Sequence, residues 1–212
     1  MKDYTELVFI LDRSGSMSGL ENDTIGGFNS VLDEHKAMGD DALVTTVLFD
    51  HKTQMICERE KISKVKHLTR KEYYVRGCTA LLDAVGSTIR TISAAHKTLP
   101  KHHRPAHTIV VITTDGMENA SKTFSYGHVK KLIEKKQGKG WEFIFMGANI
   151  DAAAEAANLG IAEGHAVTYR ADSAGSKALY QSIACATSAV RACGVLTEDW
   201  ADAVVADRRA RG

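Results

Sequence analysis

Three short polar segments of the chain carry side chains of the kind that bind hard divalent cations. They are "DRSGS" at residues 12–16, "GCTA" at 77–80 and "TDG" at 114–116. The first and third directly follow apolar runs, and the second leads into an apolar stretch at helical spacing. Together they supply two carboxylates and three hydroxyls, on Asp12, Ser14, Ser16, Thr79 and Asp115.

This set of oxygens suits magnesium. Mg²⁺ takes about six oxygen ligands in a near-octahedral arrangement at roughly 2.0–2.1 Å. Two carboxylates would neutralise the ion, and neutral hydroxyls would leave it strongly electrophilic. The D-x-S-x-S spacing directs Asp12, Ser14 and Ser16 to one side of a turn that Gly15 allows to close. An open coordination position would attract an anionic oxygen, such as a partner's Asp or Glu carboxylate. Mn²⁺ and Ca²⁺ also accept oxygen ligands.

The first segment, taken alone, has a second interpretation. Asp and Ser are favoured in turns and at helix N-termini, so "DRSGSMSG" could be a turn in which Ser16 or Ser18 caps the next helix. The presence of Thr79 and Asp115 in two further segments favours the metal site, because a cap requires neither of them.

The alternation of short β-branched runs with longer amphipathic stretches predicts the elements that position these segments. We expect strands at 6–12, 42–50, 53–59, 107–115, 141–149 and 165–170, and helices at 21–38, 79–99, 125–140, 151–160 and 176–193. This order predicts an α/β fold, a three-layer, doubly wound (Rossmann-like), mostly parallel sheet with helices on both faces. The short link at 50–52 predicts one antiparallel edge strand. Ligands bind such sheets at the carboxyl ends of the strands, where the polar segments are expected to meet.

The sequences "DRSGSMSG", "GCTALLDAV" and "TTDGMEN" resemble, in order and approximate spacing, the three loops of the metal-ion-dependent adhesion site (MIDAS) of von Willebrand factor type A (VWA) domains. The resemblance extends from about Thr5 to Ala189 and is of the bacterial or phage, intracellular, single-domain type. It implies a VWA domain over 1–195. In the extension over 196–212, Thr197 could cap a short helical segment through Val205, and "DRRARG" is expected to be a loose basic end.

The resemblance also implies a role for each polar segment. Asp12, Ser14 and Ser16 would form the first metal loop, Thr79 would belong to the second and Asp115 to the third. The family consists largely of binding modules and is not itself catalytic. Cys78 departs from the family pattern, in which a small residue, often glycine, is usual, and its role stays open.

Composition excludes several other classes of protein. The chain has 212 residues, 44% of them hydrophobic, and a formal net charge of +1, so no nucleic-acid or membrane partner is indicated. No apolar run is long enough for a membrane span or a signal peptide, and we expect a single cytoplasmic domain. The four cysteines have neither C-x-x-C nor zinc-like spacing. Oligomeric state cannot be inferred.

Four residues within the loops, Arg13, Met17, Glu118 and Asn119, are expected to border the open coordination position, solvated or packed on its rim. Arg13 would screen the two carboxylates.

Two basic segments lie outside the loops. "KHHRPAH" (101–107) has three histidines, His102, His103 and His107, and could hold a second metal, but its position before a strand favours a solvated loop. "KKLIEKKQGK" (130–139) resembles a phosphate-binding run, but its helical spacing favours a solvated face.

The leading functional hypothesis is a divalent-metal-dependent protein-interaction module rather than an enzyme. A metal-dependent hydrolase or phosphatase is the alternative, but no general base is evident, and Asp12 lacks the second aspartate two residues on that phosphoaspartyl transfer would use. Nucleotide binding is a further alternative. It is weakened by the absence of G-x-G-x-x-G after the first strand and of G-x-x-x-x-G-K-[ST].

Overall fold

A computed structural model describes residues 4–211 and contains one six-stranded sheet in the order β3-β2-β1-β4-β5-β6. The strands are β1 (Thr5–Asp12), β2 (Ala42–Phe49), β3 (Thr53–Lys61), β4 (His107–Thr114), β5 (Trp141–Ala148) and β6 (Ala166–Tyr169). Every neighbouring pair is parallel except β2 and β3, which are antiparallel at one edge. The predicted fold class is therefore confirmed.

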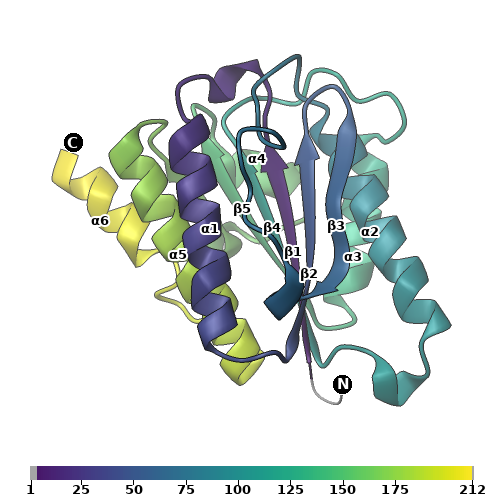
Figure 1. Ribbon diagram of the computed structural model, residues 1–212. Coiled ribbons are helices and arrows are strands. Elements are labelled where there is room, and N and C mark those ends of the chain that lie inside the picture. The colour runs from purple at the N-terminus through teal and green to yellow at the C-terminus, as the bar shows by residue number, and fades with distance from the viewer. Residues whose placement is uncertain (1–3, 212) are drawn as a thin grey trace.

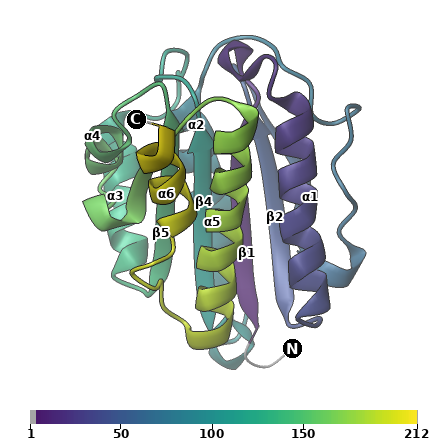
Figure 2. The ribbon, with the colours of Figure 1, turned by 90° about the vertical axis from the view of Figure 1, so that its left-hand side faces the viewer.

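Helices cover both faces of the sheet (Figures 1 and 2). They are α1 (Glu21–Ala37), α2 (Leu81–Thr98), α3 (Tyr126–Gln137), α4 (Ala152–Asn158), α5 (Ser173–Cys193) and α6 (Asp202–Arg211). Helices α1, α5 and α6 pack in one hydrophobic core, and α2, α3 and α4 pack in a second core on the opposite face. Single 3-10 turns, among them η1 (Gly15–Met17) and η3 (Lys101–His103), lie in the loops.

The central strands are apolar along their whole length because both of their faces are buried. In β1, Leu7 and Phe9 point into the core beneath α1 and α5, and Val8 and Ile10 point into the core beneath α2. This alternation follows from the two-residue period of a strand, and burial on both faces is typical of parallel sheets. The sheet is thus a rigid platform for the loops at its ends.

Strand order reverses between β1 and β4. The chain passes from β1 to β2 on one side, and β4 returns to pair with β1 on the other, with Leu11 opposite Thr113. The loops that follow β1 and β4 therefore leave the same edge of the sheet next to each other. This is the position at which doubly wound sheets bind ligands.

The C-terminal end of the chain differs from the prediction. We expected a short segment to about Val205 followed by a loose basic end, but α6 continues to Arg211. Arg211 forms ion pairs with Asp172, before α5, and with Asp207, one helical turn earlier. The contact with Asp172 joins residues far apart in the sequence, so local composition could not reveal it. The proposed boundary at residue 195 stays a prediction.

None of the helices in residues 4–211 combines the length and apolar character needed to cross a bilayer.

Candidate metal centre

The first loop begins with a buried carboxylate that its own backbone holds in place. Asp12, the last residue of β1, is fully buried, and its Oδ1 accepts a hydrogen bond of 2.6 Å from the backbone N–H of Ser14. Its Oδ2 accepts a hydrogen bond of 2.6 Å from the Thr114 hydroxyl, at the end of β4. Asp12 is thus fixed between the two strands at which the sheet order reverses.

The three predicted hydroxyls form one connected group. The Oγ atoms of Ser14 and Ser16 are 3.1 Å apart, and the Thr79 hydroxyl donates a hydrogen bond of 3.0 Å to Ser14 Oγ. Thr79 lies in the loop before α2, because that helix begins at Leu81 and not at residue 79. A side chain at Gly116 would place its Cβ 3.0 Å from Ser16 Oγ and 3.2 Å from Thr79 Oγ1. All three loops therefore converge on this group.

Asp115 brings a second buried carboxylate to the same place. It directly follows β4 and is only 2% exposed. Within residues 4–211 neither of its carboxylate oxygens has a hydrogen-bond partner. A buried carboxylate without partners is strongly disfavoured in its ionised form, so Asp115 is expected either to stay protonated or to bind a cation.

Both carboxylates have raised pKa values. Burial raises the pKa of Asp12 from 3.8 to about 6, although hydrogen bonds from Thr114 and Ser14 oppose the rise. Burial also raises the pKa of Asp115, and the nearby Ser16 hydroxyl offsets part of the effect. Without a cation, the folded chain therefore holds two carboxylates that resist ionisation.

The chemistry of this donor set fits a hard divalent cation. Asp12 and Asp115 supply two negative charges, and Ser14, Ser16 and Thr79 supply neutral oxygens, with no thiol or imidazole among them. Residues 4–211 contain no cluster of three or more His, Cys, Asp or Glu side chains that could hold a metal. The predicted ligand set, which includes three hydroxyl oxygens, is therefore not of a kind that a cluster of His, Cys, Asp and Glu side chains alone would supply, and it stays a prediction.

The helix-capping interpretation of the first loop is wrong. The N-cap position of α1 is Leu20, and no side chain caps it. Ser16 lies inside the 3-10 turn η1, and Ser18 only follows it. The hydroxyl of Ser16 is consequently directed to Ser14 and not to the end of a helix.

Arg13 has a different role from the one predicted. Instead of screening Asp12 and Asp115, it is fully buried, and its Nε donates a hydrogen bond of 3.0 Å to Asp50 Oδ2. Arg76 Nε donates to the same oxygen at 2.8 Å, and the backbone N–H of Lys52 donates to Asp50 Oδ1 at 2.8 Å. Although burial opposes it, these donors hold the pKa of Asp50 below its usual range.

The ion pairs of Asp50 position the first two metal loops. The Arg76 backbone N–H donates to the Arg13 carbonyl, and the Ala80 N–H donates to the Asp50 carbonyl. A further bond from Gly15 N–H to the Gly77 carbonyl joins the loops directly. Sequence reasoning missed this arrangement. Asp50 shares one feature with Asp12 and Asp115, since it too lies at the carboxyl end of a buried strand, but that position does not identify Arg13 as its partner.

The other residues expected at the rim brace the loops. Met17 is buried. Asn119 Oδ1 accepts a hydrogen bond of 2.9 Å from the Thr79 backbone N–H, which fixes that residue toward the third loop. Glu118 accepts hydrogen bonds from the backbone N–H groups of Leu82 and Ser121, so it closes the start of α2 against the loop after β4.

Two large apolar side chains are exposed on the loops around the centre. Met117 follows Gly116 and is 70% exposed, and Tyr74 is 42% exposed. Tyr74 lies against the guanidinium groups of Arg13 and Arg76, whose carbon atoms are 5.1 and 5.2 Å from the ring centroid. Cys78 is also exposed and is a free thiol. Exposed Met and Tyr side chains are typical of surfaces that bind proteins.

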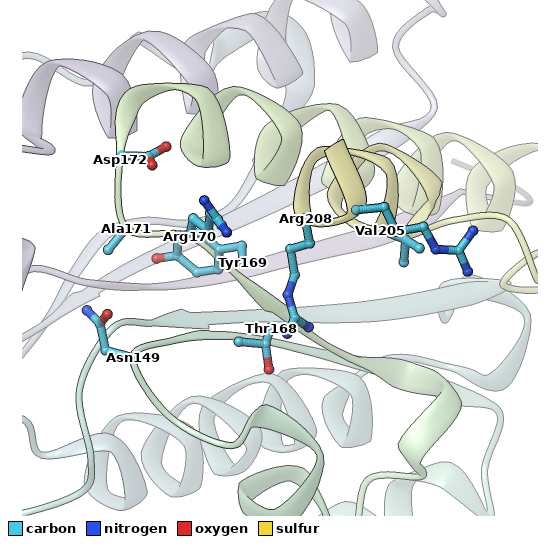
Figure 3. Close-up of a pocket in the computed structure, with 9 residues that line it drawn as sticks. Asn149, Thr168, Tyr169, Arg170, Ala171, Asp172, Val205 and Arg208 are labelled. Atoms are coloured by element: carbon cyan, nitrogen blue, oxygen red, sulfur yellow. The ribbon is translucent and has the colours of Figure 1, made fainter. Parts of the chain in front are cut away.

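A cavity of about 640 Å³ opens at the ends of β5 and β6 (Figure 3). Its wall includes Tyr169, and Arg208 reaches from α6 toward Thr168. Burial, then neighbouring Tyr180 and the charges of Asp115 and Asp12, raises the pKa of Tyr169. Because β1, β4, β5 and β6 are parallel, this cavity opens at the same edge of the sheet as the three polar loops.

Among the described residues, the histidines of segment 101–107 form no cluster of three or more His, Cys, Asp or Glu side chains that could hold a metal. His102 and His103 are exposed in the turn η3, at the end of the sheet away from the metal loops.

No protein-family model and no curated protein matches the sequence. Solved structures do match it. The von Willebrand factor domain of the type V pili tip protein Mfa5 from Porphyromonas gingivalis has a TM-score of 0.63 at 10% identity, over 93% of this chain and 99% of that one.

Two other matching structures contain metal ions. Proximal thread matrix protein 1 from the mussel byssus, with a zinc-occupied MIDAS motif, has a TM-score of 0.54 at 15% identity, over 81% of this chain and 42% of that one. Manganese-loaded TRAP protein from Plasmodium vivax has a TM-score of 0.51 at 16% identity, over 68% of this chain and 57% of that one. This chain thus spans less than two thirds of either protein. The likenesses show a shared fold, the Rossmann-like fold of VWA domains.

Proposed function

We propose that the protein is a divalent-metal-dependent interaction module that binds an Asp or Glu side chain of a protein partner. The observation that carries the proposal is the buried carboxylate of Asp115, which has no partner within residues 4–211 and lies beside three converging hydroxyls. The solved structures with zinc and manganese at the same fold support the proposal.

Asp12, Ser14, Ser16, Thr79 and Asp115 would hold the ion. A bound divalent cation supplies an electrophilic centre that accepts an anionic oxygen from outside the protein. The hydrogen bonds from Thr114 and from the Ser14 backbone hold Asp12 in a fixed orientation. Asn119 and the ion pairs of Asp50 hold the loops, so little rearrangement is needed when the ion binds.

Mg²⁺ is the proposed ion, because all five side chains supply oxygen and magnesium is a hard cation. Mn²⁺ accepts the same ligands and is the ion named for the Plasmodium structure. Ca²⁺ is the third candidate. Direct comparison of the three ions by calorimetry decides among them.

The rim around the centre supports a protein as the partner. Met117 and Tyr74 are apolar groups that a partner would cover. In the neighbouring cavity, Arg208 and Arg209 form no ion pair within residues 4–211. We propose that they attract acidic residues next to the carboxylate that meets the metal.

We also propose that the module is not itself an enzyme. The hydrogen bonds of Asp12 come from a hydroxyl and a backbone N–H, and no imidazole contacts Asp12 or Asp115 within residues 4–211. Phosphatase, esterase and nucleotide-binding assays test the alternatives. Metal-dependent turnover that Asp12→Ala abolishes would replace this proposal with a hydrolase.

A cytoplasmic location is part of the proposal. All four cysteines are free thiols, and three of them are exposed, which suits a reducing compartment.

The functional test is affinity capture in three arms: the wild-type chain with Mg²⁺, the wild-type chain with chelator, and Asp12→Ala with Mg²⁺. A true partner is retained only in the first arm, and replacing one of its acidic residues by the amide abolishes retention. Asp199→Asn, at an exposed position away from the loops, is the matched control and should behave as wild type. A partner retained equally in all arms would show that binding does not use the metal.

A further inference from the structure

The two basic segments 101–107 and 130–139, each of which is typical of a solvated surface, lie together at the amino-terminal ends of the central strands. Arg104 comes from the histidine-rich segment, and Lys136 and Lys139 come from the end of α3 and the turn after it. They meet Lys97, near the end of α2, around a cavity of about 170 Å³. Its wall also contains the side chains of His96 and Trp141.

The cations of this cavity are not neutralised by the chain. Lys97, Lys136 and Lys139 form no ion pair within residues 4–211, and Arg104 Nε donates only to the Leu99 carbonyl, at 3.2 Å. Burial lowers the pKa of Lys136, and repulsion from Lys139, Lys97 and Lys135 lowers it further. A counter-anion would relieve this repulsion.

A carboxylate behind the cavity, that of Glu6, is already paired with a cation. Glu6 is fully buried, and its Oε2 lies 3.2 Å from His96 Nε2 and 2.9 Å from Arg59 Nε. Because Arg59 neutralises Glu6, that carboxylate does not compensate the lysines.

Part of the cavity is built of ordered side chains. Lys136 Nζ lies 4.6 Å from the centroid of the Trp141 ring, which holds the ammonium by a cation–π contact. The His96 ring meets Trp141 edge-on at 5.3 Å, and Trp141 is only 7% exposed. At least one cation is therefore held toward the cavity rather than moving freely in solvent.

We propose that this cavity binds the phosphate group of a compact phosphorylated ligand. Arginine forms paired hydrogen bonds with phosphate oxygens, and lysine contributes point charges, so Arg104 with Lys97, Lys136 and Lys139 suits a multiply charged oxyanion. The volume of about 170 Å³ is below the roughly 300–1,000 Å³ of pockets that enclose a whole small molecule. The cavity therefore has room for a phosphate or diphosphate group but not for a nucleoside.

This site is independent of the proposed metal centre. The cavity lies at the start of β4 and β5, and the metal loops lie at the opposite ends of the strands. Loss of one site should leave the other unchanged.

The test is isothermal titration of sodium diphosphate into the full chain without divalent metal, at low and constant ionic strength. We expect one site with a Kd of about 1 mM or tighter. The double variant Lys97→Gln/Lys136→Gln should weaken binding at least about tenfold, since each removes a direct phosphate contact. Lys131→Gln is the matched control, because it removes an equally charged, exposed lysine from α3 outside the cavity and should bind as wild type.

Further arms identify the source of the phosphate and guard against misfolding. Titration with orthophosphate and with ADP shows whether a free anion or the phosphate end of a larger molecule binds more tightly, and either result supports the site. Arg104→Gln, on an exposed loop, should also weaken binding while leaving the thermal midpoint unchanged. The proposal is overturned by absence of heat with all three ligands, or by equal affinities in the double variant and in Lys131→Gln.

Discussion

Three buried aspartates lie at the carboxyl ends of the neighbouring strands β2, β1 and β4, but the charged groups around them differ. Asp50, after β2, accepts hydrogen bonds from Arg13 and Arg76, and its pKa is lowered. Asp12 and Asp115 have no cation beside them within residues 4–211, and their pKa values are raised. The fold neutralises one carboxylate with its own side chains and leaves two without a counter-charge.

This contrast separates a structural carboxylate from carboxylates available to a ligand. Asp50 stabilises the loops through ion pairs that are complete in the folded chain. Asp12 and Asp115 have no such cation among the described residues, and burial disfavours their ionised forms; in the proposed function a bound divalent ion would supply the missing charge. Residue type and burial alone do not distinguish the two roles, because all three are aspartates with at most 2% exposure. The partners of each carboxylate do.

The largest change in the free energy of unfolding is expected for Asp50→Asn. Asp50→Asn should lower the free energy of unfolding by about 3–5 kcal/mol, because it leaves the buried Arg13 guanidinium without a counter-charge. Urea unfolding of the metal-free protein measures the change, with Asp199→Asn expected within about 0.5 kcal/mol of wild type. A loss below about 1 kcal/mol at Asp50 would remove the distinction between the two kinds of carboxylate.

In the metal-free protein, Asp12→Asn should raise the free energy of unfolding, whereas Asp50→Asn should lower it. An acid whose pKa rises on folding from 3.8 to about 6 contributes stability below pH 3.8 and loses it as the pH rises through 6. The full difference corresponds to about 3 kcal/mol, so the amide should stabilise the chain at neutral pH by up to this amount, less the hydrogen bonds it weakens.

The pH profile of Asp12 must be measured as a difference between wild type and Asp12→Asn. Burial and then Arg191 lower the pKa of His35 from 6.5 to about 4, so its contribution to stability falls as the pH falls from 6.5 to 4. This change opposes that of Asp12 in the same range and is common to both proteins. The role given to Asp12 would be contradicted if the free energy of unfolding changed between pH 4 and pH 7 by the same amount in wild type and in Asp12→Asn.

Metal affinity should decrease in acid. Because the ion must displace a proton from Asp12, and the pKa of Asp12 is about 6, Mg²⁺ affinity should fall by up to about tenfold per pH unit below that value. Titration calorimetry at several pH values, in buffers of different ionisation heat, measures both the affinity and the protons released. An affinity independent of pH between 7 and 5 would place the ion elsewhere.

The smallest changes in metal affinity and stability are expected for Gly116→Ala. In Gly116→Ala the new Cβ would lie 3.0 Å from Ser16 Oγ and 3.2 Å from Thr79 Oγ1, so the hydroxyls must shift. We expect metal affinity to fall by about tenfold and stability to change by less than about 1 kcal/mol. Gly127→Ala is the control, because its Cβ would meet no atom within 4 Å. Unchanged affinity in Gly116→Ala would show that the three hydroxyls do not form one site.

Much of this structure follows from patterns within the sequence. The strands and most helices follow from hydrophobic periodicity, and the convergence of Ser14, Ser16 and Thr79 follows from the topology of a doubly wound sheet. The partners of the charged groups do not follow. Arg13 pairs with Asp50, 37 positions away, and not with the adjacent Asp12. Local sequence contains no information about such a pairing.

Local sequence also does not reveal the contacts between distant segments at the two ends of the strands. At the end of α6, Arg211 forms an ion pair with Asp172, and the basic cavity joins Arg104 to Lys136 across different elements. Each segment alone is typical of a solvated surface. Only the fold brings their charges together.

In the proposed function, Asp12 and Asp115 hold a divalent cation, because neither has a counter-charge within residues 4–211. Titration of Mg²⁺ into the metal-free protein tests it most directly, in wild type, Asp12→Ala, Asp115→Ala and the control Asp199→Asn. We expect one binding event in wild type and in the control, and none in the two alanine variants. Equal binding in all four proteins would contradict it.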